Sequence, residues 1–310
     1  MSPTFIAAYD GSDASRSAVQ LAVRLGRAEH ADVIAVHVYP RVPPTHPPAE
    51  VPEADRELQD DVRVAGQVVL DALDVPGVAG RRLVCGSPAH TLHDLAAEHG
   101  ASLIAVGVTH HERLGRLMPG SVGAKLLHGA PCAVAAVPRG MGDARMQTIG
   151  VAYDGGRESQ QALIAGERLA RRLGAHLILF GVHEESMFAG PALATTWDLD
   201  PAVHGAWPAG VHASREVLAE QLRAAAARVS GIEIQVEQLT GPAGPTLVDA
   251  CDDSVDLLVA GSRSHGPLSS VLLGSVSRHL VDHTRCPVLV VPRTTQAELD
   301  RSSEPKTSHV

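Results

Sequence analysis

Two short apolar runs, one in each half of the sequence, are followed directly by an acidic residue. Asp10 follows the run TFIAAY, and Asp154 follows TIGVAY. A carboxylate at the carboxyl end of a strand can accept a ribose hydroxyl or hold a Mg²⁺ ion that accompanies phosphates. Alternatively, each acid caps the helix after it, as aspartate before a polar first turn often does. The sequence leaves both interpretations open.

A loop in the second half has the composition of a phosphate-binding site. A strand-like run ends at Gly261, and the loop after it leads to Gly-Ser-Val-Ser at residues 274–277, where a helix begins. Glycine lets the backbone approach a phosphate, and the free amides at a helix start bind anions. No G-x-x-x-x-G-K-[ST] run occurs in the chain. The phosphates would therefore be held without a Walker lysine.

An internal repeat organises the chain. The segment AYDG at residues 8–11 recurs at 152–155, GSV at 120–122 recurs at 274–276, and VPR at 137–139 recurs at 291–293. We therefore predict two copies of one module: copy one over residues 1–140 and copy two over residues 146–294. The glycine-rich segment 140–145 is predicted to be a flexible linker, and the polar tail over residues 295–310 to be disordered.

Each copy alternates β-branched runs with helical patterns, which is typical of βαβ units and a parallel sheet. Five strands with right-handed crossovers predict an α/β, doubly wound sheet that binds ligands at the carboxyl ends of its strands. The expected strands are TFIAAY, DVIAVHV, RRLVC, SLIAVG and CAVAAV in copy one, and TIGVAY, HLILFGV, EIQVEQL, DLLVAG and PVLVV in copy two. Helices are expected over residues 12–27, 53–73, 158–173 and 214–229.

Composition excludes several classes of protein. Aromatic residues make up only 3% of the chain, so the cores must be built from Ala, Val, Leu and Ile. The net charge of -9 argues against a nucleic-acid partner, which would require a basic surface. No apolar run reaches the roughly 18 residues of a membrane span, and no secretion signal is recognisable. We therefore expect a cytoplasmic protein.

The spacing of Gly261, Ser264, Gly274 and Ser275 resembles the G-x2-G-x9-G-[ST] motif of ATP-binding universal stress proteins. The start of a helix at Pro242-Ala243 and the closing run CPVLVVP are also similar to that family. The resemblance covers roughly residues 4–139 and 147–293. It implies that each copy has a flavodoxin-like, adenine nucleotide alpha hydrolase-like fold.

In copy two the resemblance implies a site for ATP, with or without Mg²⁺. Ala152 and Asp154 would meet the nucleoside, and Val182 would lie beside the base. Gly261 and Ser264 would line the loop, whereas the phosphates would be held by Gly274, Ser275, Val276 and Ser277. Ser264 replaces the motif's second glycine; a serine forced to positive φ there would cost about 1 kcal/mol.

Copy one departs further from the motif. The residues that correspond to the site are Asp10, Gly107, Gly120, Ser121 and Val122. His110 replaces the second glycine. Glu112 in the same loop could repel a phosphate, although His110 and Arg113 could offset its charge. Copy two is therefore the better candidate site.

Three functions remain open. The first is a non-catalytic, ATP-dependent regulator of an unidentified protein partner in the stress response. The second is an interaction module of this fold that has lost nucleotide binding. The third is a slow ATPase, or another nucleotide- or flavin-using enzyme. The absence of a Walker lysine and of a recognisable catalytic base counts against fast turnover, so we assign no catalytic residue.

Association and metal binding complete the expectations. The resemblance implies pairing of modules through their last strands, 133–137 and 288–291, so the chain could form an internal pseudo-dimer, and two chains a homodimer. The pairs His279/His283 and His90/His93 have the spacing of metal ligands but no obvious third ligand, so we predict no metal site. Cys132 and Cys286 are interpreted as inert core thiols rather than redox groups.

Overall fold

The computed structural model describes residues 2–43, 53–111, 116–118, 125–143, 145–184, 215–252, 254–262, 271–272 and 274–292. Each copy contains five parallel strands in the spatial order third, second, first, fourth, fifth. Copy one consists of β1 (Thr4–Ala8), β2 (Asp32–Tyr39), β3 (Gly80–Cys85), β4 (Leu103–His111) and β7 (Ala133–Pro138). Copy two consists of β8 (Thr148–Ala152), β9 (His176–His183), β10 (Ile234–Thr240), β11 (Leu257–Gly261) and β13 (Val288–Val291). The predicted pair of doubly wound sheets is confirmed.

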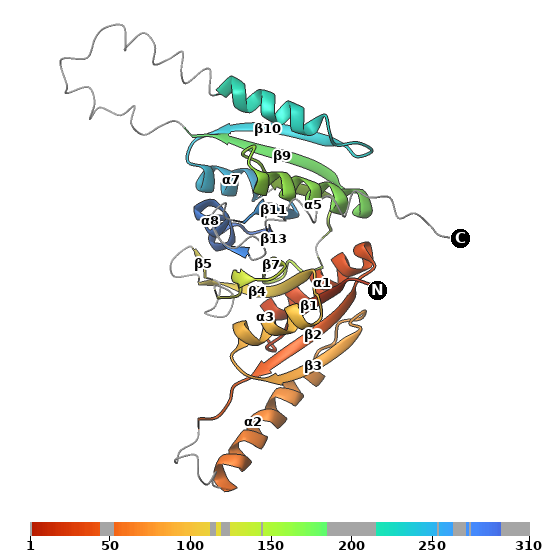
Figure 1. Cartoon of the computed structure of the whole chain (residues 1–310), viewed down its shortest axis with the longest axis vertical. Helices are drawn as coiled ribbons and strands as arrows, with labels where there is room; N and C mark the ends of the chain where they lie inside the picture. Colours follow the sequence, from red (N-terminus) through yellow and green to blue (C-terminus); the bar gives the residue numbers. More distant parts are fainter. Residues whose placement is uncertain are drawn as a thin grey trace, which may run out of the picture.

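The two sheets join into one through their last strands. β7 and β13 pair antiparallel, with Ala135 opposite Leu289. The joined sheet runs through the middle of the molecule from β3 to β10 (Figure 1). This is the internal pairing of modules that the resemblance implies.

Helices cover both faces of the sheet and bury one apolar cluster on each. The first cluster packs under α1 (Asp13–Glu29), α2 (Glu53–Asp71), α5 (Arg157–Leu173) and a helix over residues 215–226. The second packs under α3 (Pro88–Glu98), α7 (Ala243–Cys251) and α8 (Ser275–His283). The four helices predicted from periodicity agree with α1, α2, α5 and helix 215–226 to within a few residues at each end.

The helix ends follow from local chemistry. Ser12 is the N-cap of α1, and its hydroxyl accepts the Ser15 amide at 3.2 Å. α5 ends at Gly174, which has φ +66°, a left-handed conformation that glycine adopts without steric cost. Among the described helices, none combines the length and the apolar character that crossing a membrane requires.

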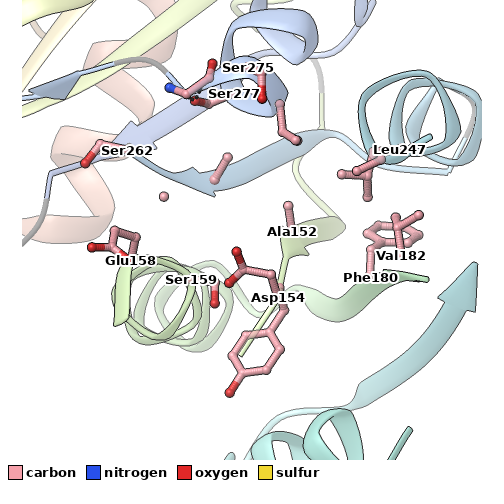
Figure 2. A pocket seen from close by; sticks show the side chains of 16 residues that line it. Ala152, Asp154, Glu158, Ser159, Phe180, Val182, Leu247, Ser262, Ser275 and Ser277 are labelled. Atoms are coloured by element: carbon pink, nitrogen blue, oxygen red, sulfur yellow. Dashed lines mark hydrogen bonds between the residues drawn. The ribbon is translucent and has the colours of Figure 1, made fainter. Parts of the chain in front are cut away.

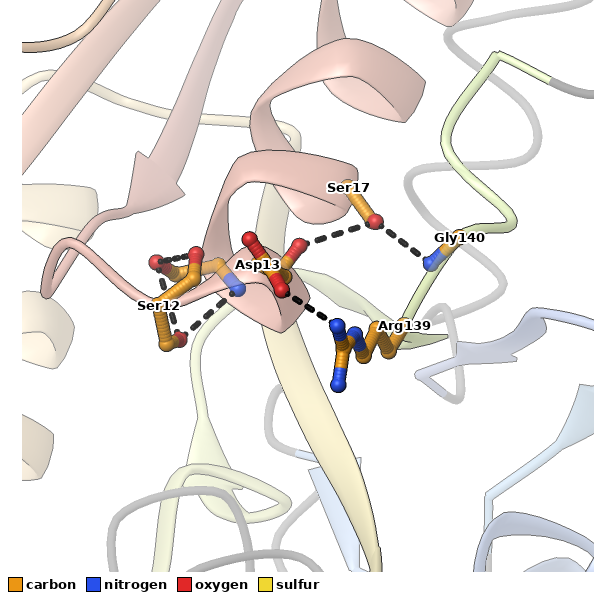
Figure 3. A network of polar contacts seen from close by, with 6 residues as sticks. Ser12, Asp13, Ser17, Arg139 and Gly140 are labelled. Carbon is orange, nitrogen blue, oxygen red and sulfur yellow. Dashed lines mark hydrogen bonds and ion pairs between the residues drawn. The ribbon is translucent and has the colours of Figure 1, made fainter.

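Gly140 and Gly142, in the segment between the copies, are packed against α1, so the prediction of a flexible linker is wrong for this part of it. The Gly140 amide donates to Ser17 Oγ at 2.9 Å, and Arg139 forms an ion pair with Asp13 at 2.7 Å (Figure 3). A Cβ on Gly142 would lie 2.2 Å from the Ser17 carbonyl oxygen. The glycine content of this segment thus permits close packing rather than flexibility.

Three short strands were not predicted. β5 (Arg116–Met118) pairs antiparallel with β4. β6 (His128–Ala130) of copy one and β12 (Val271–Leu272) of copy two form a small separate sheet. The predicted disordered tail lies outside the described residues.

Candidate functional site

A pocket of about 560 Å³ opens at the carboxyl ends of the copy two strands (Figure 2). It lies where the strand order reverses, between β8 and β11, which is the place at which open α/β sheets bind ligands. The residues that line it are Ala152, Tyr153, Asp154, Glu158, Ser159, Phe180, Val182, Ala243, Leu247, Ala260, Gly261, Ser262, Gly274, Ser275, Val276 and Ser277.

The structure brings most of the predicted copy two residues to this pocket. Those present are Ala152, Asp154, Val182, Gly261, Gly274, Ser275, Val276 and Ser277. Ser264 lies outside the described residues. Phe180 lines the pocket but was not among the predicted site residues. It lies two residues before Val182 in β9 and therefore on the same face of the strand. Glu158, in the first turn of the helix after the Asp154 strand tip, was also not predicted.

The pocket has an apolar end and a polar end. Phe180, Val182 and Leu247 lie together at one end, and Ser275 and Ser277 lie at another, beside the start of α8 (Figure 2). Phe180 is fully buried. A pocket of this size that joins an apolar surface to a few convergent polar groups is suited to a small molecule.

The start of α8 supplies free backbone amides to the polar end. The Gly274 amide donates to Ser277 Oγ at 2.9 Å, and the first helical bond runs from Arg278 to the Gly274 carbonyl at 3.0 Å. The amides of residues 275–277 therefore have no acceptor within the helix. The buried Ser277 hydroxyl is engaged by Gly274, whereas the side chain of Ser275 is exposed.

Ser262 presents a second polar feature of the pocket. It is 7% exposed, and among the described residues its Oγ has no hydrogen-bond partner. A buried hydroxyl without a partner is costly, and a ligand in the pocket is one source of a partner.

The strand-tip acids do not cap the following helices. The N-cap of α5 is Gly156, and that of α1 is Ser12. Asp154 Oδ1 accepts the Gly156 amide at 2.8 Å, and Asp10 Oδ1 accepts the Ser12 amide at 3.0 Å. Each acid therefore stabilises a turn before its helix.

The two carboxylates differ in the number of hydrogen bonds that they accept from the turn after them. Asp10 Oδ1 also accepts the Ser12 hydroxyl at 2.6 Å; glycine at the matching position 156 cannot make this bond. Burial acts to raise the pKa of Asp10, but the hydrogen bonds from Ser12 and Ser15 together hold it below its usual value. Gly156 contacts the Asp154 carboxylate through its backbone amide alone. The Asp154 carboxylate is therefore more available to a ligand than that of Asp10.

The glycine that ends the fourth strand has a packing role in both copies. A Cβ on Gly261 would lie 2.7 Å from the backbone of Glu158, and a Cβ on Gly107 would lie 2.4 Å from the backbone of Ala14. Because these two residues have no side chain, the first turn of α5 can pack closely on the end of β11, and the first turn of α1 on β4. Their conservation between the copies follows from the fold, with or without a phosphate.

The described pocket is acidic. Asp154 and Glu158 line it, and none of its described lining residues is lysine, arginine or histidine. Copy one has Ala14 where copy two has Glu158. In copy one, Asp10 and Gly107 lie at the matching strand ends, whereas Gly120, Ser121 and Val122 fall outside the described residues.

The cysteines and histidines are placed as follows. Cys132 and Cys286 are buried, and this burial raises the pKa of each thiol to about 12, which agrees with inert core thiols. His279 and His283 stack with ring centroids 3.9 Å apart. Within the described ranges, no three His, Cys, Asp or Glu side chains gather as a metal site would require.

The fold and the pocket define a tandem α/β protein with a pocket at the strand ends of copy two. The chain belongs to the universal stress protein family, whose model matches residues 1–138 and 146–292. The chain is 27% identical to Universal stress protein Rv2319c of Mycobacterium tuberculosis over an alignment of 303 residues that covers 93% of this chain and 99% of the relative.

Two further comparisons agree. A universal stress protein of Mycolicibacterium smegmatis is 28% identical over 294 residues, covering 91% of this chain and 94% of the relative. The crystal structure of a universal stress protein from Archaeoglobus fulgidus superposes with a TM-score of 0.64 at 17% identity, covering 94% and 98% of the two chains. The whole tandem architecture is therefore shared.

Proposed function

We propose that the chain is an ATP-binding regulator in the stress response and that its nucleotide occupies the copy two pocket. The observation that carries the proposal is the pairing of an apolar end at Phe180 and Val182 with the free amides at the start of α8, across one pocket. A nucleotide has the same polarity: an apolar base at one end and phosphates at the other.

The apolar end would receive the adenine. Phe180 is fully buried, and it lines this end of the pocket together with Val182 and Leu247 (Figure 2). Ala152, at the end of β8, adds a small side chain that leaves room for a planar base (Figure 2).

The strand tip would receive the ribose and a cation. The Asp154 carboxylate can accept a ribose hydroxyl or hold Mg²⁺. Asp154 and Glu158 would together repel an uncompensated triphosphate, so a divalent cation would accompany the phosphates. Such a cation would supply positive charge that the described lining residues lack.

The start of α8 would receive the phosphates. The amides of residues 275–277 point out of the first turn, where the helix dipole favours an anion. The exposed Ser275 hydroxyl can donate as well. Ser277 would act indirectly, because its hydroxyl fixes the Gly274 amide at the helix start.

The proposal assigns regulation rather than turnover. The described pocket lining contains no histidine, lysine or cysteine, and the proposal assigns its two carboxylates, Asp154 and Glu158, to the ribose and the cation rather than to proton transfer. Occupancy would instead order the phosphate end of the pocket and alter a surface read by a partner protein. In copy one, the Ser12 hydroxyl already donates a hydrogen bond to the Asp10 carboxylate. We therefore assign copy one to protein interaction rather than to nucleotide binding.

A matched pair of variants tests the proposal. Equilibrium dialysis of the full chain with ATP and Mg²⁺ should give about one nucleotide per chain. Asp154→Ala should weaken binding about tenfold, as loss of a charged hydrogen-bond partner does, whereas the equivalent Asp10→Ala should leave the Kd unchanged. Equal losses in both variants, or no ATP bound by the unmodified chain, would refute it.

A further inference from the structure

The chain that leads into α8 of copy two is held by copy one. β12 pairs antiparallel with β6 of copy one, with Leu272 opposite His128 and Val271 opposite Ala130. Leu272 stands two residues before Gly274, the N-cap of α8. The backbone that sets the phosphate-facing helix start is therefore hydrogen-bonded to the other copy.

A glycine bulge makes this pairing possible. The three residues of β6 lie opposite the two residues of β12, and the register shifts between Val271 and Leu272. The extra residue is Gly129, with φ +90°. A bulge with glycine at positive φ is a common device for bending an antiparallel strand. The nearest atom to a Cβ built there, His93 Cε1, is 3.9 Å away, so a side chain would strain the backbone without a clash.

The two copies differ at this residue, which explains why β6 occurs where it does. Aligned on the repeated GSV segments, Gly129 corresponds to His283. In copy two, α8 continues to His283. In copy one, residues 125–126 are helical, but the chain leaves the helical conformation before His128 and forms β6 through Gly129.

A second contact acts on the same helix. β5 of copy one packs against α8 of copy two, and the two elements lie side by side in Figure 1. Copy one thus holds both the segment before α8 and the helix itself. The antiparallel junction of β7 with β13 fixes the two copies in the relative position that these contacts require.

We propose that the segment His128–Ala130 is a positioning element for the copy two site: it holds the α8 start in the geometry that binds the phosphates. This inference rests on the proposed function. Nucleotide binding in copy two then depends on copy one, although copy one binds no nucleotide itself. By thermodynamic linkage, ATP strengthens the β6–β12 pairing by the same factor by which the pairing strengthens ATP binding.

The first experiment uses Gly129→Ala in the full chain. The added methyl group strains the positive φ and disfavours the bulge, so the ATP Kd should rise about fivefold. Gly231→Ala is the matched control. Gly231 also has positive φ, +74°, and open space around its missing Cβ, but it lies in the turn before β10. Gly231→Ala should lower the thermal stability about as much as Gly129→Ala does, but it should leave the ATP Kd unchanged.

The second experiment separates positioning from general destabilisation. Hydrogen exchange of the amides of β6 should slow when ATP and Mg²⁺ are added to the unmodified chain. The slowing should be lost in Gly274→Glu, which places an anion at the helix start and removes ATP binding.

The outcomes distinguish the two proposals. Absence of ATP binding by the unmodified chain would overturn the proposed function and this inference with it. If the unmodified chain binds ATP, but Gly129→Ala binds it equally well and β6 exchange does not respond, only the positioning role is overturned. A Kd change confined to Gly129→Ala, with ATP-dependent protection of β6, supports the inference.

Discussion

Gly261 and the backbone of Glu158 approach so closely that a Cβ on Gly261 would lie 2.7 Å from the Glu158 carbonyl carbon. This contact joins the end of β11 to the first turn of α5. It therefore sets the distance between two sides of the pocket. On one side are Asp154 and the start of α5, and on the other is the end of β11, from which the chain leads to α8.

We expect Gly261→Ala to damage stability and the site together. The methyl group cannot be accommodated without moving α5 away from β11, and overpacking of this kind costs about 1–3 kcal/mol. Urea denaturation should show a lower midpoint, and the ATP Kd should rise. Gly107→Ala makes the equivalent clash in copy one, against Ala14. Gly107→Ala should lower the urea midpoint while raising the ATP Kd less than Gly261→Ala does. If both variants were as stable as the unmodified chain, the close packing of these glycines would not matter for stability.

ATP binding should depend on a divalent cation. A Cβ on Gly156 would lie 2.9 Å from Asp154 Oδ1 and 3.5 Å from Glu158 Oε2, so both carboxylates flank one short stretch of backbone at the pocket. Chelation of Mg²⁺ should weaken ATP binding by on the order of tenfold, and AMP binding less.

Glu158→Gln provides the control for this charge effect. It removes one negative charge without changing the size of the side chain, and copy one has the uncharged Ala14 at this position. The variant should bind ATP with a smaller Mg²⁺ dependence, as measured by calorimetry with and without chelator. Equal ATP affinity in the presence and absence of Mg²⁺ in the unmodified chain would contradict the prediction.

Asp10 should contribute to stability in a pH-dependent manner. Its pKa in the folded protein lies below the usual 3.8, because hydrogen bonds from Ser12 and Ser15 outweigh the opposing effect of burial. A lowered pKa stabilises the fold above the unfolded-state pKa, and this stability is lost as the pH falls through the folded-state pKa.

The variant Asp10→Asn keeps an acceptor oxygen but not the charge. Urea midpoints should show the unmodified chain to be the more stable at pH 6, with the difference shrinking as the pH is lowered below about 4. NMR titration of the Asp10 carboxyl carbon should give a midpoint below 3.8. A difference in stability that is constant from pH 6 to pH 3 would rule out the charged interaction.

Much of the fold was predictable from the sequence because it depends on local patterns. The repeated AYDG and GSV segments revealed two copies, and the β-branched runs between helical patterns predicted the parallel strands. The same repeats indicated Asp154 and residues 274–277 as site candidates, since ligands of this kind of sheet bind at strand ends.

The rest depended on contacts between residues far apart in the chain. Sequence alone left open whether Asp10 and Asp154 cap their helices; the structure shows Ser12 and Gly156 as the caps. The glycine-rich linker looked flexible because composition does not reveal that Gly142 packs on α1. Phe180 and Leu247 reach the pocket from different elements, which only the packed sheet brings together.

The sequence by itself determined that the protein is a doubled α/β module with a glycine-serine helix start, because repeats and periodicity are properties of the chain. Only the tertiary structure decided that copy one holds the α8 start of copy two through β6 and β12. Strand pairing joins residues by their positions in space, and a single positive-φ glycine, Gly129, directs the backbone there.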